Sequence, residues 1–314
     1  MSAGAATTCR ASVVLPVRDG GERLGRLLEA LDGQELAGGL EVVAVDSGST
    51  DGSAERLARH GARVLRIAPS AFDHGASRNL GVRAAGAEIV VFMSQDAVPA
   101  DAHCVRRLVE ALEGDARLAG AFARQVPRED ADPLTRRDLG AWVASGTAGR
   151  VAFRGTPEDW AGRTPLERVH LAAFDNVASA ARRRLLLDRP FPPTRFGEDI
   201  EWGLAMLERG HGLAYVPEAV VVHSHRRSAR ELFRRSYLCH RALHRLFGLE
   251  RLPDRRRLVS AAARAVAADL WTLAREGAGL ASVLAAPAQA VAALYGEYRG
   301  AGDERAVRPY PDWA

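Results

Sequence analysis

Four groups of polar residues stand out in this sequence because their side chains suit chemistry on an anionic ligand. Asp46 lies in "VDSGSTDGS", Asp96 lies in "MSQDAVP", and Glu198 and Asp199 lie in "FGEDIEW". The stretch "AFDHGASRNLG" (71–81) places an aspartate, a histidine, an arginine and an asparagine within seven residues. Carboxylates can accept a proton or hold a cation, and arginine pairs well with anionic oxygens. Together the four groups point to a site that holds something anionic.

Each group alone also has an ordinary structural explanation. The segment 46–53 could be a tight turn that caps the next helix, and Asp96 could be a turn residue. A pair of carboxylates at a helix start, as at 198–199, interacts favourably with the helix dipole, and that alone could explain it. The loop 71–81 could simply be solvated. These explanations leave open why all four groups fall at the ends of buried elements.

The strands and helices that must position these groups can be predicted from two patterns of apolar residues. Short β-branched runs predict strands, and 3–4 spacing of apolar residues predicts helices between them. The predicted strands are 11–17, 40–46, 63–67 and 88–93, and the predicted helices are 21–33, 53–61, 77–87 and 101–114. This alternation predicts an α/β domain with a doubly wound, mostly parallel sheet. In such a sheet the ligand site lies beyond the carboxyl ends of the strands, which is where Asp46 and Asp96 fall.

The rest of the chain has a different rhythm. Residues 127–175 carry prolines, glycines and two tryptophans, and they predict irregular structure around a short helix. A helix is expected at about 199–209 and a strand at about 213–222. His223 and His225 follow that strand, and residues two apart face the same way. Two long helical segments, at about 228–247 and 254–298, complete the chain.

Composition excludes several classes of protein. At 47% hydrophobic and 26% charged residues, the 314-residue chain is typical of a globular protein and not of a disordered one. The net charge is +4, but all 43 basic residues are arginines and they are scattered along the chain. A scattered excess of this kind does not predict a nucleic-acid-binding protein.

Three features bear on the compartment. Cys9, Cys104 and Cys239 are widely spaced and cannot all pair, which indicates a reducing environment. The first ten residues, "MSAGAATTCR", contain one charge and no apolar run, so they are not typical of a signal peptide. No stretch of about 18 uninterrupted apolar residues occurs. We therefore expect a cytoplasmic protein.

Five motifs, in this order and spacing, resemble the family 2 glycosyltransferases, which have a GT-A fold. They are "SVVLPVRDG", "VDSGSTDGS", "FDHGASRNLG", "VFMSQDAVP" and "GEDIEWG". The His-Gly-x-x-Arg-Asn and Gln-Asp-Ala versions resemble the bacterial rhamnosyltransferase-like branch. The resemblance covers residues 11 to about 240. It implies a GT-A catalytic domain at 1–225, with a nucleotide-sugar half at 11–126 and an acceptor half at 127–225, followed by a helical region at 226–314.

The resemblance also implies which residues bind the nucleotide-sugar donor. Asp46 would accept a hydrogen bond from the base, and Arg78 would reach the diphosphate. Asn79 would brace its loop. The full set is Pro16, Arg18, Asp46, Ser47, His74, Arg78, Asn79, Gln95 and Asp96.

A divalent cation, Mg²⁺ or Mn²⁺, is implied at Asp96, which matches the last aspartate of the family's Asp-x-Asp motif. The first aspartate is replaced by Ser94, a departure that the rhamnosyltransferase-like branch shares. A neutral histidine can complete such a site, and we expect His223 first and His225 second.

Inverting transfer needs one carboxylate to take the proton of the acceptor hydroxyl. Asp199 is the expected catalytic base, with Glu198 as the alternative. Trp202, one turn further along the same helix, could stack on an acceptor sugar or fill the core.

The resulting prediction is an inverting glycosyltransferase that moves rhamnose from its thymidine-diphosphate form onto a cell-surface glycan or a lipid-linked acceptor. Alternatives are the same fold with a UDP-hexose or furanose donor, and a catalytically dead donor-binding or scaffold module. The arginine-rich helical tail could contact the inner face of the membrane or mediate oligomer formation.

Overall fold

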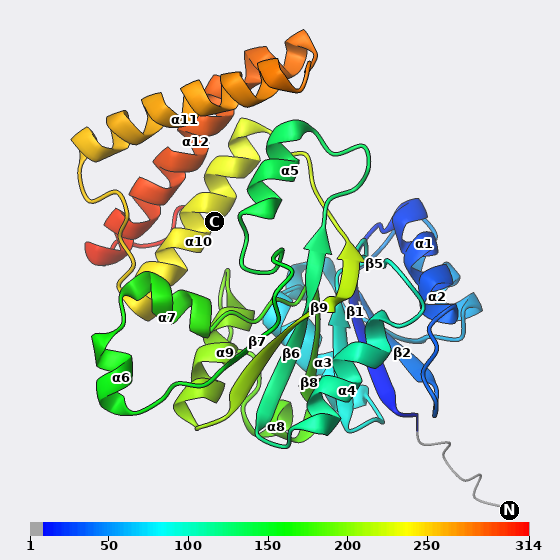
Figure 1. Ribbon diagram of the computed structural model, residues 1–314. Helices are drawn as coiled ribbons and strands as arrows, with labels where there is room; N and C mark the ends of the chain where they lie inside the picture. The colour runs from blue at the N-terminus through cyan, green and yellow to red at the C-terminus, as the bar shows by residue number, and fades with distance from the viewer. Residues whose placement is uncertain (1–8, 314) are drawn as a thin grey trace, which may run out of the picture.

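The computed structural model describes residues 9–313, and within them the chain forms one nine-stranded sheet with helices on both faces (Figure 1). The strand order is β3-β2-β1-β4-β8-β6-β9-β5, and β7 pairs with β9. The strands are β1 Ala11–Val17, β2 Leu40–Asp46, β3 Arg63–Arg66, β4 Ile89–Met93, β5 Val98–Pro99, β6 Leu118–Val126, β7 Arg150–Ala152, β8 Ala178–Arg182 and β9 Gly212–Val222.

Most of the sheet runs in one direction. Strands β1 to β4 are mutually parallel, and β8 is antiparallel to both β4 and β6. Strand β9 is parallel to β6. The carboxyl ends of β1, β2, β4, β6 and β9 therefore lie along one edge, which we call the carboxyl edge. The mostly parallel α/β sheet expected from the sequence is confirmed.

Helices cover the sheet and extend beyond it. They are α1 Gly21–Asp32, α2 Ser53–Arg59, α3 His74–Ala84, α4 Cys104–Gly114, α5 Pro133–Gly140, α6 Pro157–Gly162, α7 Pro165–Leu171, α8 Arg183–Asp188, α9 Glu198–Glu208, α10 Ala229–Phe247, α11 Arg255–Arg275 and α12 Leu280–Arg305. A 3₁₀ turn, η1, spans Pro69–Ala71. Helices α10, α11 and α12 form a separate layer at the carboxyl edge (Figure 1).

Two hydrophobic cores lie on opposite faces of the sheet because strand side chains alternate. On β1, Val13 and Leu15 pack in one core with residues of α1 and α4. Val14, between them, packs in the other core with Val82 of α3 and Met206 of α9. This double cover fixes the sheet rigidly beneath the loops of the carboxyl edge.

The structure departs from the sequence-based prediction at several elements. Helix α3 begins at His74, because the Asp73 side chain accepts from Ala76 N–H at 2.7 Å and caps the helix. Strands β6 and β8 were not predicted, and the segment 127–175 contains α5, β7, α6 and α7. The long helix expected at 254–298 is two helices separated at 276–279, where Gly277 has φ +64°.

The helical layer is held together by close backbone contact. A Cβ on Gly300 would lie 2.2 Å from Tyr237 O, and one on Gly296 would lie 2.5 Å from Phe233 O. Only glycine at these two positions lets α12 approach α10 this closely. None of the described helices combines the length and apolar character that crossing a bilayer requires. The division of the chain at residue 225 stays a prediction, and the N-terminal segment 1–8 lies outside the described residues.

Candidate active site

A cavity of about 550 Å³ opens at the carboxyl edge of the sheet. It is lined by residues of the sheet loops and the start of α9, and by residues of α5, α10 and α12. Asp199, Glu198, His223 and His225 all face this cavity. The cavity thus brings the two histidines together with Glu198 and Asp199, whereas Asp46 and Asp96 are not among its lining residues.

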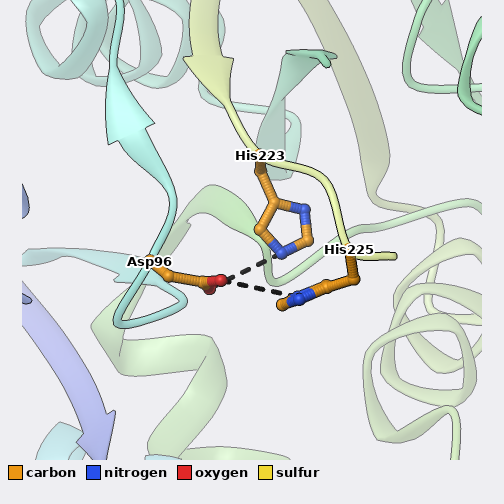
Figure 2. Close-up of side chains that lie close together, drawn as sticks. All are labelled: Asp96, His223 and His225. Atoms are coloured by element: carbon orange, nitrogen blue, oxygen red, sulfur yellow. Dashed lines mark ion pairs between the residues drawn. The ribbon is translucent and has the colours of Figure 1, made fainter. Parts of the chain in front are cut away.

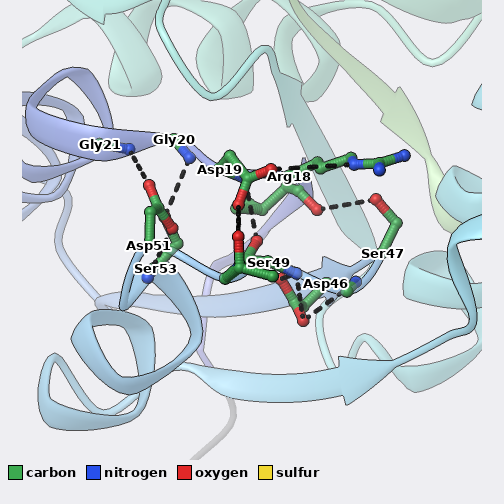
Figure 3. Close-up of polar contacts among 12 residues, drawn as sticks. Arg18, Asp19, Gly20, Gly21, Asp46, Ser47, Ser49, Asp51 and Ser53 are labelled. Carbon is green, nitrogen blue, oxygen red and sulfur yellow. Dashed lines mark hydrogen bonds and ion pairs between the residues drawn. The ribbon is translucent and has the colours of Figure 1, made fainter.

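The loops after β1 and β2 are tied to each other by side chain–backbone hydrogen bonds (Figure 3). Asp51 Oδ2 accepts from Gly21 N–H at 2.8 Å, and Ser53 Oγ accepts from Gly20 N–H at 2.9 Å. Asp19 Oδ1 accepts from Thr50 N–H at 2.8 Å. These bonds fix the backbone where the expected nucleotide-binding residues lie.

Asp46 and Ser47 end β2 beside the end of β1, and both are buried. Asp46 accepts from the backbone N–H groups of Gly48 and Ser49, both at 3.3 Å, so its carboxylate is oriented by its own turn. Ser47 Oγ donates to Val17 O at 3.1 Å. Ser47 therefore acts first as a link between the two strands.

Pro16 and Arg18 lie at the end of β1, next to the loop after β4. The Gln95 side-chain amide bonds to the backbone of Arg18 in both directions, at 2.9 Å to the nitrogen and 3.0 Å to the oxygen. Gln95 is thus a brace between the β1 and β4 loops, and the Arg18 guanidinium is left exposed.

Asp96, His223 and His225 converge at the ends of β4 and β9 (Figure 2). His223 Nε2 lies 3.6 Å from Asp96 Oδ1, and His225 Nε2 lies 3.5 Å from Asp96 Oδ2. Three ligand atoms, one from each residue, fall within 4.8 Å of one another. The distances and the donor types, one carboxylate and two imidazoles, fit a divalent cation such as Mn²⁺.

The electrostatics of this group favour neutral histidines. Burial lowers the pKa of His223 to about 4, with Asp96 opposing and His225 and Arg128 adding to the shift. Burial also lowers the pKa of His225. Imidazole must be neutral to be a ligand, so both rings are in the form that a cation needs. Asp96 is also paired with Arg128, whose Nη2 lies 3.1 Å from Oδ2.

Glu198 and Arg78 form an ion pair at the start of α9. Gly197, the residue before the helix, has φ +81°, a conformation that glycine adopts without strain and that turns the chain into α9. Arg78 Nη1 then lies 2.6 Å from Glu198 Oε1. Arg78 also lines the cavity, so its expected contact with a diphosphate stays a prediction, but its guanidinium is already paired with a buried carboxylate.

Asp199 differs from its neighbour because, among the described residues, no arginine is paired with it. Its Oδ2 accepts from Asn176 N–H at 3.2 Å, and its Oδ1 accepts from Ile200 N–H at 2.8 Å. Burial raises the pKa of Asp199 to about 7, and the charges of Glu198 and Asp175 add to the shift. A carboxylate with this pKa can take up and release a proton near neutral pH.

His74, Gly75 and Asn79 occupy the first turns of α3. The Asn79 side chain bonds to the backbone of Phe191 in both directions, at 2.9 and 3.0 Å. A Cβ on Gly75 would lie 2.9 Å from Pro192 O, so glycine at this position lets α3 lie close to the backbone of residue 192. Asn79 is therefore a brace and not a free donor-binding group, whereas His74 is exposed and lines the cavity.

Trp202 lies in the core, which corrects its expected role in acceptor stacking. The side chain is 1% exposed, and its Nε1 donates to Arg189 O at 2.9 Å. The indole packs against the rings of Phe174 and Phe191, with centroids 4.9 and 5.8 Å apart. Core filling, the alternative that the sequence left open, is what the structure shows.

Three residues of the site were missed at the level of sequence. Gln125 is the penultimate residue of β6, and Asp175 precedes β8, two strands that were not predicted. Arg227 follows the histidine pair and lines the cavity, and burial lowers its pKa to about 10. Arg227 could have been identified as a site residue from the sequence, because it lies two residues after His225 in "HSHRRS".

The sequence of the chain is similar to those of known proteins. The family model described as "Glycosyl transferase family 2" matches residues 12–168, which is half of the chain. The chain is 27% identical over 232 residues to the O-antigen chain rhamnosyltransferase RfbN of Salmonella typhimurium, covering 72% of this chain and 70% of that protein. It is 28% identical over 202 residues to the O-antigen chain rhamnosyltransferase WbaN of Salmonella anatum, covering 63% and 60%.

A solved structure extends the similarity to the whole fold. The mannosyltransferase PcManGT from Pyrobaculum calidifontis, in complex with GDP-Man and Mn²⁺, superimposes with a TM-score of 0.60 at 19% identity. The superposition covers 94% of this chain and 87% of the other.

Proposed function

Because the chain belongs to glycosyl transferase family 2, we propose that it transfers rhamnose from dTDP-rhamnose, with inversion, to a growing cell-surface glycan. The two rhamnosyltransferase relatives support the sugar and the type of acceptor. The observation that carries the catalytic assignment is Asp199, a carboxylate with a raised pKa that faces the same cavity as His223 and His225. A UDP-hexose or furanose donor on the same fold is the alternative.

Asp199 is the proposed general base. It would accept the proton of the acceptor hydroxyl while that oxygen attacks the anomeric carbon from the face opposite the nucleotide. Glu198 is the less suitable candidate, because its carboxylate is bound to Arg78 at 2.6 Å. The Arg78–Glu198 pair instead holds the first turn of α9 and places one negative charge next to Asp199.

The nucleotide would lie over the tied loops after β1 and β2, with its base near Asp46, Pro16 and Arg18. The diphosphate needs a cation that is not already neutralised. Both Arg78 and Arg227 line the cavity, but Arg78 is paired with Glu198, whereas among the described residues no carboxylate is paired with Arg227. Burial also disfavours the charge of Arg227 in the absence of an anion, so it suits this role better. His74 lies at the start of α3 on the same cavity.

Asp96, His223 and His225 are the residues that would hold a divalent cation, Mn²⁺ or Mg²⁺. Such a cation stabilises the negative charge that the departing nucleoside diphosphate gains. The fit rests on the ligand atoms within 4.8 Å of one another and on the lowered pKa values of both histidines.

The donor is testable without knowledge of the acceptor. A ligand that binds only the folded state raises the melting temperature, so a panel of nucleotide sugars can be ranked by thermal shift in the presence of Mn²⁺. The proposal expects dTDP-rhamnose to give the largest shift. A larger shift with a UDP-hexose or UDP-furanose would replace the donor and leave the family assignment intact.

We also propose that the helical layer docks on an anionic membrane surface. Helix α12 carries an apolar stripe, which consists of Leu280, Leu284, Ala288, Val291 and Tyr295 at helical spacing, and Leu280 and Leu284 are 72% and 71% exposed. Residues 280–296 contain no charged side chain. The α12 stripe is thus an exposed apolar surface about four turns long.

Charge favours lipid over a second copy of the chain as the partner of the α12 stripe. Residues 226–314 contain 16 arginines and nine acidic residues. Arg230 of α10 lies beside the stripe, in the same groove as Val291 and Tyr295. Two copies of this basic surface would repel each other, whereas an anionic bilayer would attract it.

A further inference from the structure

Gln125 lies buried between a histidine of the proposed cation site and an acidic residue next to the proposed base. Its Oε1 lies 3.2 Å from His223 Nδ1, and its Nε2 donates to Asp175 Oδ2 at 2.6 Å. The side chain is 5% exposed and sits on β6, whose backbone pairs with β9 up to Val126–Val222. The amide is therefore held on a rigid strand and has two fixed neighbours.

The neighbours of Asp175 determine which way the amide points. Asp175 Oδ2 also accepts from Trp142 Nε1–H at 3.0 Å, and Oδ1 accepts from Val177 N–H at 3.0 Å. Both oxygens are thus acceptors, so the Gln125 nitrogen must face Asp175 and its oxygen must face His223. An amide oxygen only accepts, so the proton of the neutral imidazole is on Nδ1, and the lone pair of Nε2 faces Asp96.

We propose that Gln125 is a positioning residue that holds His223 as its Nδ1–H tautomer, with Nε2 presented to a cation at Asp96. This inference rests on the proposed cation site. Ligand histidines are commonly oriented by an acceptor on their second nitrogen, and loss of that acceptor weakens cation binding. Here the acceptor is a neutral amide whose own orientation is set by Asp175.

The segment that contains Asp175 also contacts the other half of the site. The residue after Asp175 is Asn176, whose backbone N–H donates to Asp199 Oδ2 at 3.2 Å. Asp175 therefore orients the cation ligand through Gln125 and borders the proposed base through the chain itself. One short segment therefore contacts both the proposed cation site and the proposed base.

The first test reads the tautomer directly, without any cation. In ¹⁵N-histidine-labelled protein, the nuclear magnetic resonance signals of His223 should show a protonated Nδ1 and an unprotonated Nε2. These signals are assigned to His223 because they are absent from the spectrum of His223→Ala. Gln125→Leu removes the acceptor and should shift the resonances toward a mixture of tautomers. A pure Nδ1–H form that persists in Gln125→Leu would overturn the proposal, as would an Nε2–H form in the unmodified protein.

The second test measures Mn²⁺ affinity by electron paramagnetic resonance of the free ion. We expect Gln125→Leu to weaken binding roughly tenfold to a hundredfold. Gln125→Glu keeps the shape but sets two carboxylates against each other, so it should also bind Mn²⁺ more weakly. The double variant Gln125→Glu/Asp175→Asn places a carboxylate at position 125 and an amide at position 175. A donor then faces an acceptor again, with the polarity of the pair reversed, but Trp142 Nε1–H loses its acceptor, so part of the affinity should be recovered.

The outcomes distinguish the positioning role of Gln125 from the cation site on which it rests. If the unmodified protein and Asp96→Asn bind Mn²⁺ equally, the cation site itself is wrong, while the tautomer result still stands or falls alone. If the unmodified protein binds Mn²⁺ and Gln125→Leu binds it equally well, the positioning role is wrong. Should Gln125→Leu fail to fold, the isosteric Gln125→Glu and its double variant decide, and no recovery in the double variant contradicts the proposal.

Discussion

Arg78 Nη1 lies 2.6 Å from Glu198 Oε1, and both residues are buried. The two are 120 positions apart in the chain, and they connect the first turns of α3 and α9. A buried pair of this kind is costly to break, because removal of one partner leaves the other charge uncompensated. The arginine of the 71–81 stretch is therefore a fixed part of the site's framework.

The first prediction concerns stability. Arg78→Ala should lower the free energy of unfolding by about 3–5 kcal/mol, because it leaves Glu198 buried and unpaired. Urea denaturation measures this, and Arg78→Ala/Glu198→Gln should recover part of the loss. Arg209→Ala is the matched control, since Arg209 lies 2.6 Å from Asp188 in an exposed pair worth about 0–1 kcal/mol. Equal losses in Arg78→Ala and Arg209→Ala would contradict the framework role.

The second prediction concerns catalysis and pH. Asp199→Asn should reduce kcat by about a hundredfold or more while donor affinity is kept, because a general base is lost. In the unmodified protein kcat/KM should rise as pH passes upward through about 7, where the Asp199 carboxylate forms. Wild-type-like turnover in Asp199→Asn would move the role to another group.

The third prediction follows from the same raised pKa through linkage. The ordinary pKa of an aspartate is 3.8, so between about pH 4 and pH 7 folded Asp199 holds a proton that the unfolded chain has released. Its contribution to stability therefore falls as pH rises through this window. Asp199→Asn does not titrate, so its melting temperature relative to the unmodified protein should increase from about pH 5 to about pH 8. A constant difference across that range would mean that the pKa of Asp199 is not raised.

Much of the sheet could be predicted from the sequence, and the reason lies in residue types. The runs at β1, β2 and β4 are rich in valine, and their observed bounds match the prediction within one residue. Strand β6, "LAGAFARQV", has three alanines and one glycine among its nine residues, and strand β8, "ASAAR", has three alanines among five, so neither carries a β-branched pattern. They are strands because the sheet positions between β4 and β9 require small buried side chains, which is a tertiary effect.

The candidate site shows the same division. The histidines 223 and 225 could be placed next to Asp96 because each group follows a recognisable strand and parallel strands end at one edge. Gln125 and Asp175 could not, because Gln125 lies in β6 and Asp175 precedes β8, and neither of these strands was predicted. The engagement of Arg78 by Glu198 depends on the packing of α3 against α9, which no local pattern encodes.

The fourth prediction concerns the diphosphate. Arg227→Ala should weaken binding of a nucleoside diphosphate roughly tenfold to a hundredfold, the equivalent of a charge-assisted hydrogen bond of about 1.5–3 kcal/mol. Isothermal titration with dTDP in the presence of Mn²⁺ measures this. Arg264→Ala is the control, because Arg264 is exposed on α11 and donates to Ser260 of its own helix, away from the cavity. Unchanged dTDP affinity in Arg227→Ala would leave the cation and the α3 start to neutralise the diphosphate.

The last prediction concerns the α12 stripe. Vesicles that contain anionic phospholipid should bind the protein, and binding should weaken as salt screens the arginines of the helical layer. Leu284→Glu should reduce vesicle binding about tenfold or more, because it removes a side chain whose burial contributes about 1.5–3 kcal/mol and adds a charge that anionic lipid repels. Leu187→Glu is the control, since Leu187 is also exposed, at 44%, but lies on α8, outside the helical layer. Equal binding of the two variants to vesicles would show that the stripe does not dock on lipid. Sedimentation of the unmodified protein as a dimer that Leu284→Glu dissociates would assign the stripe to a second copy of the chain.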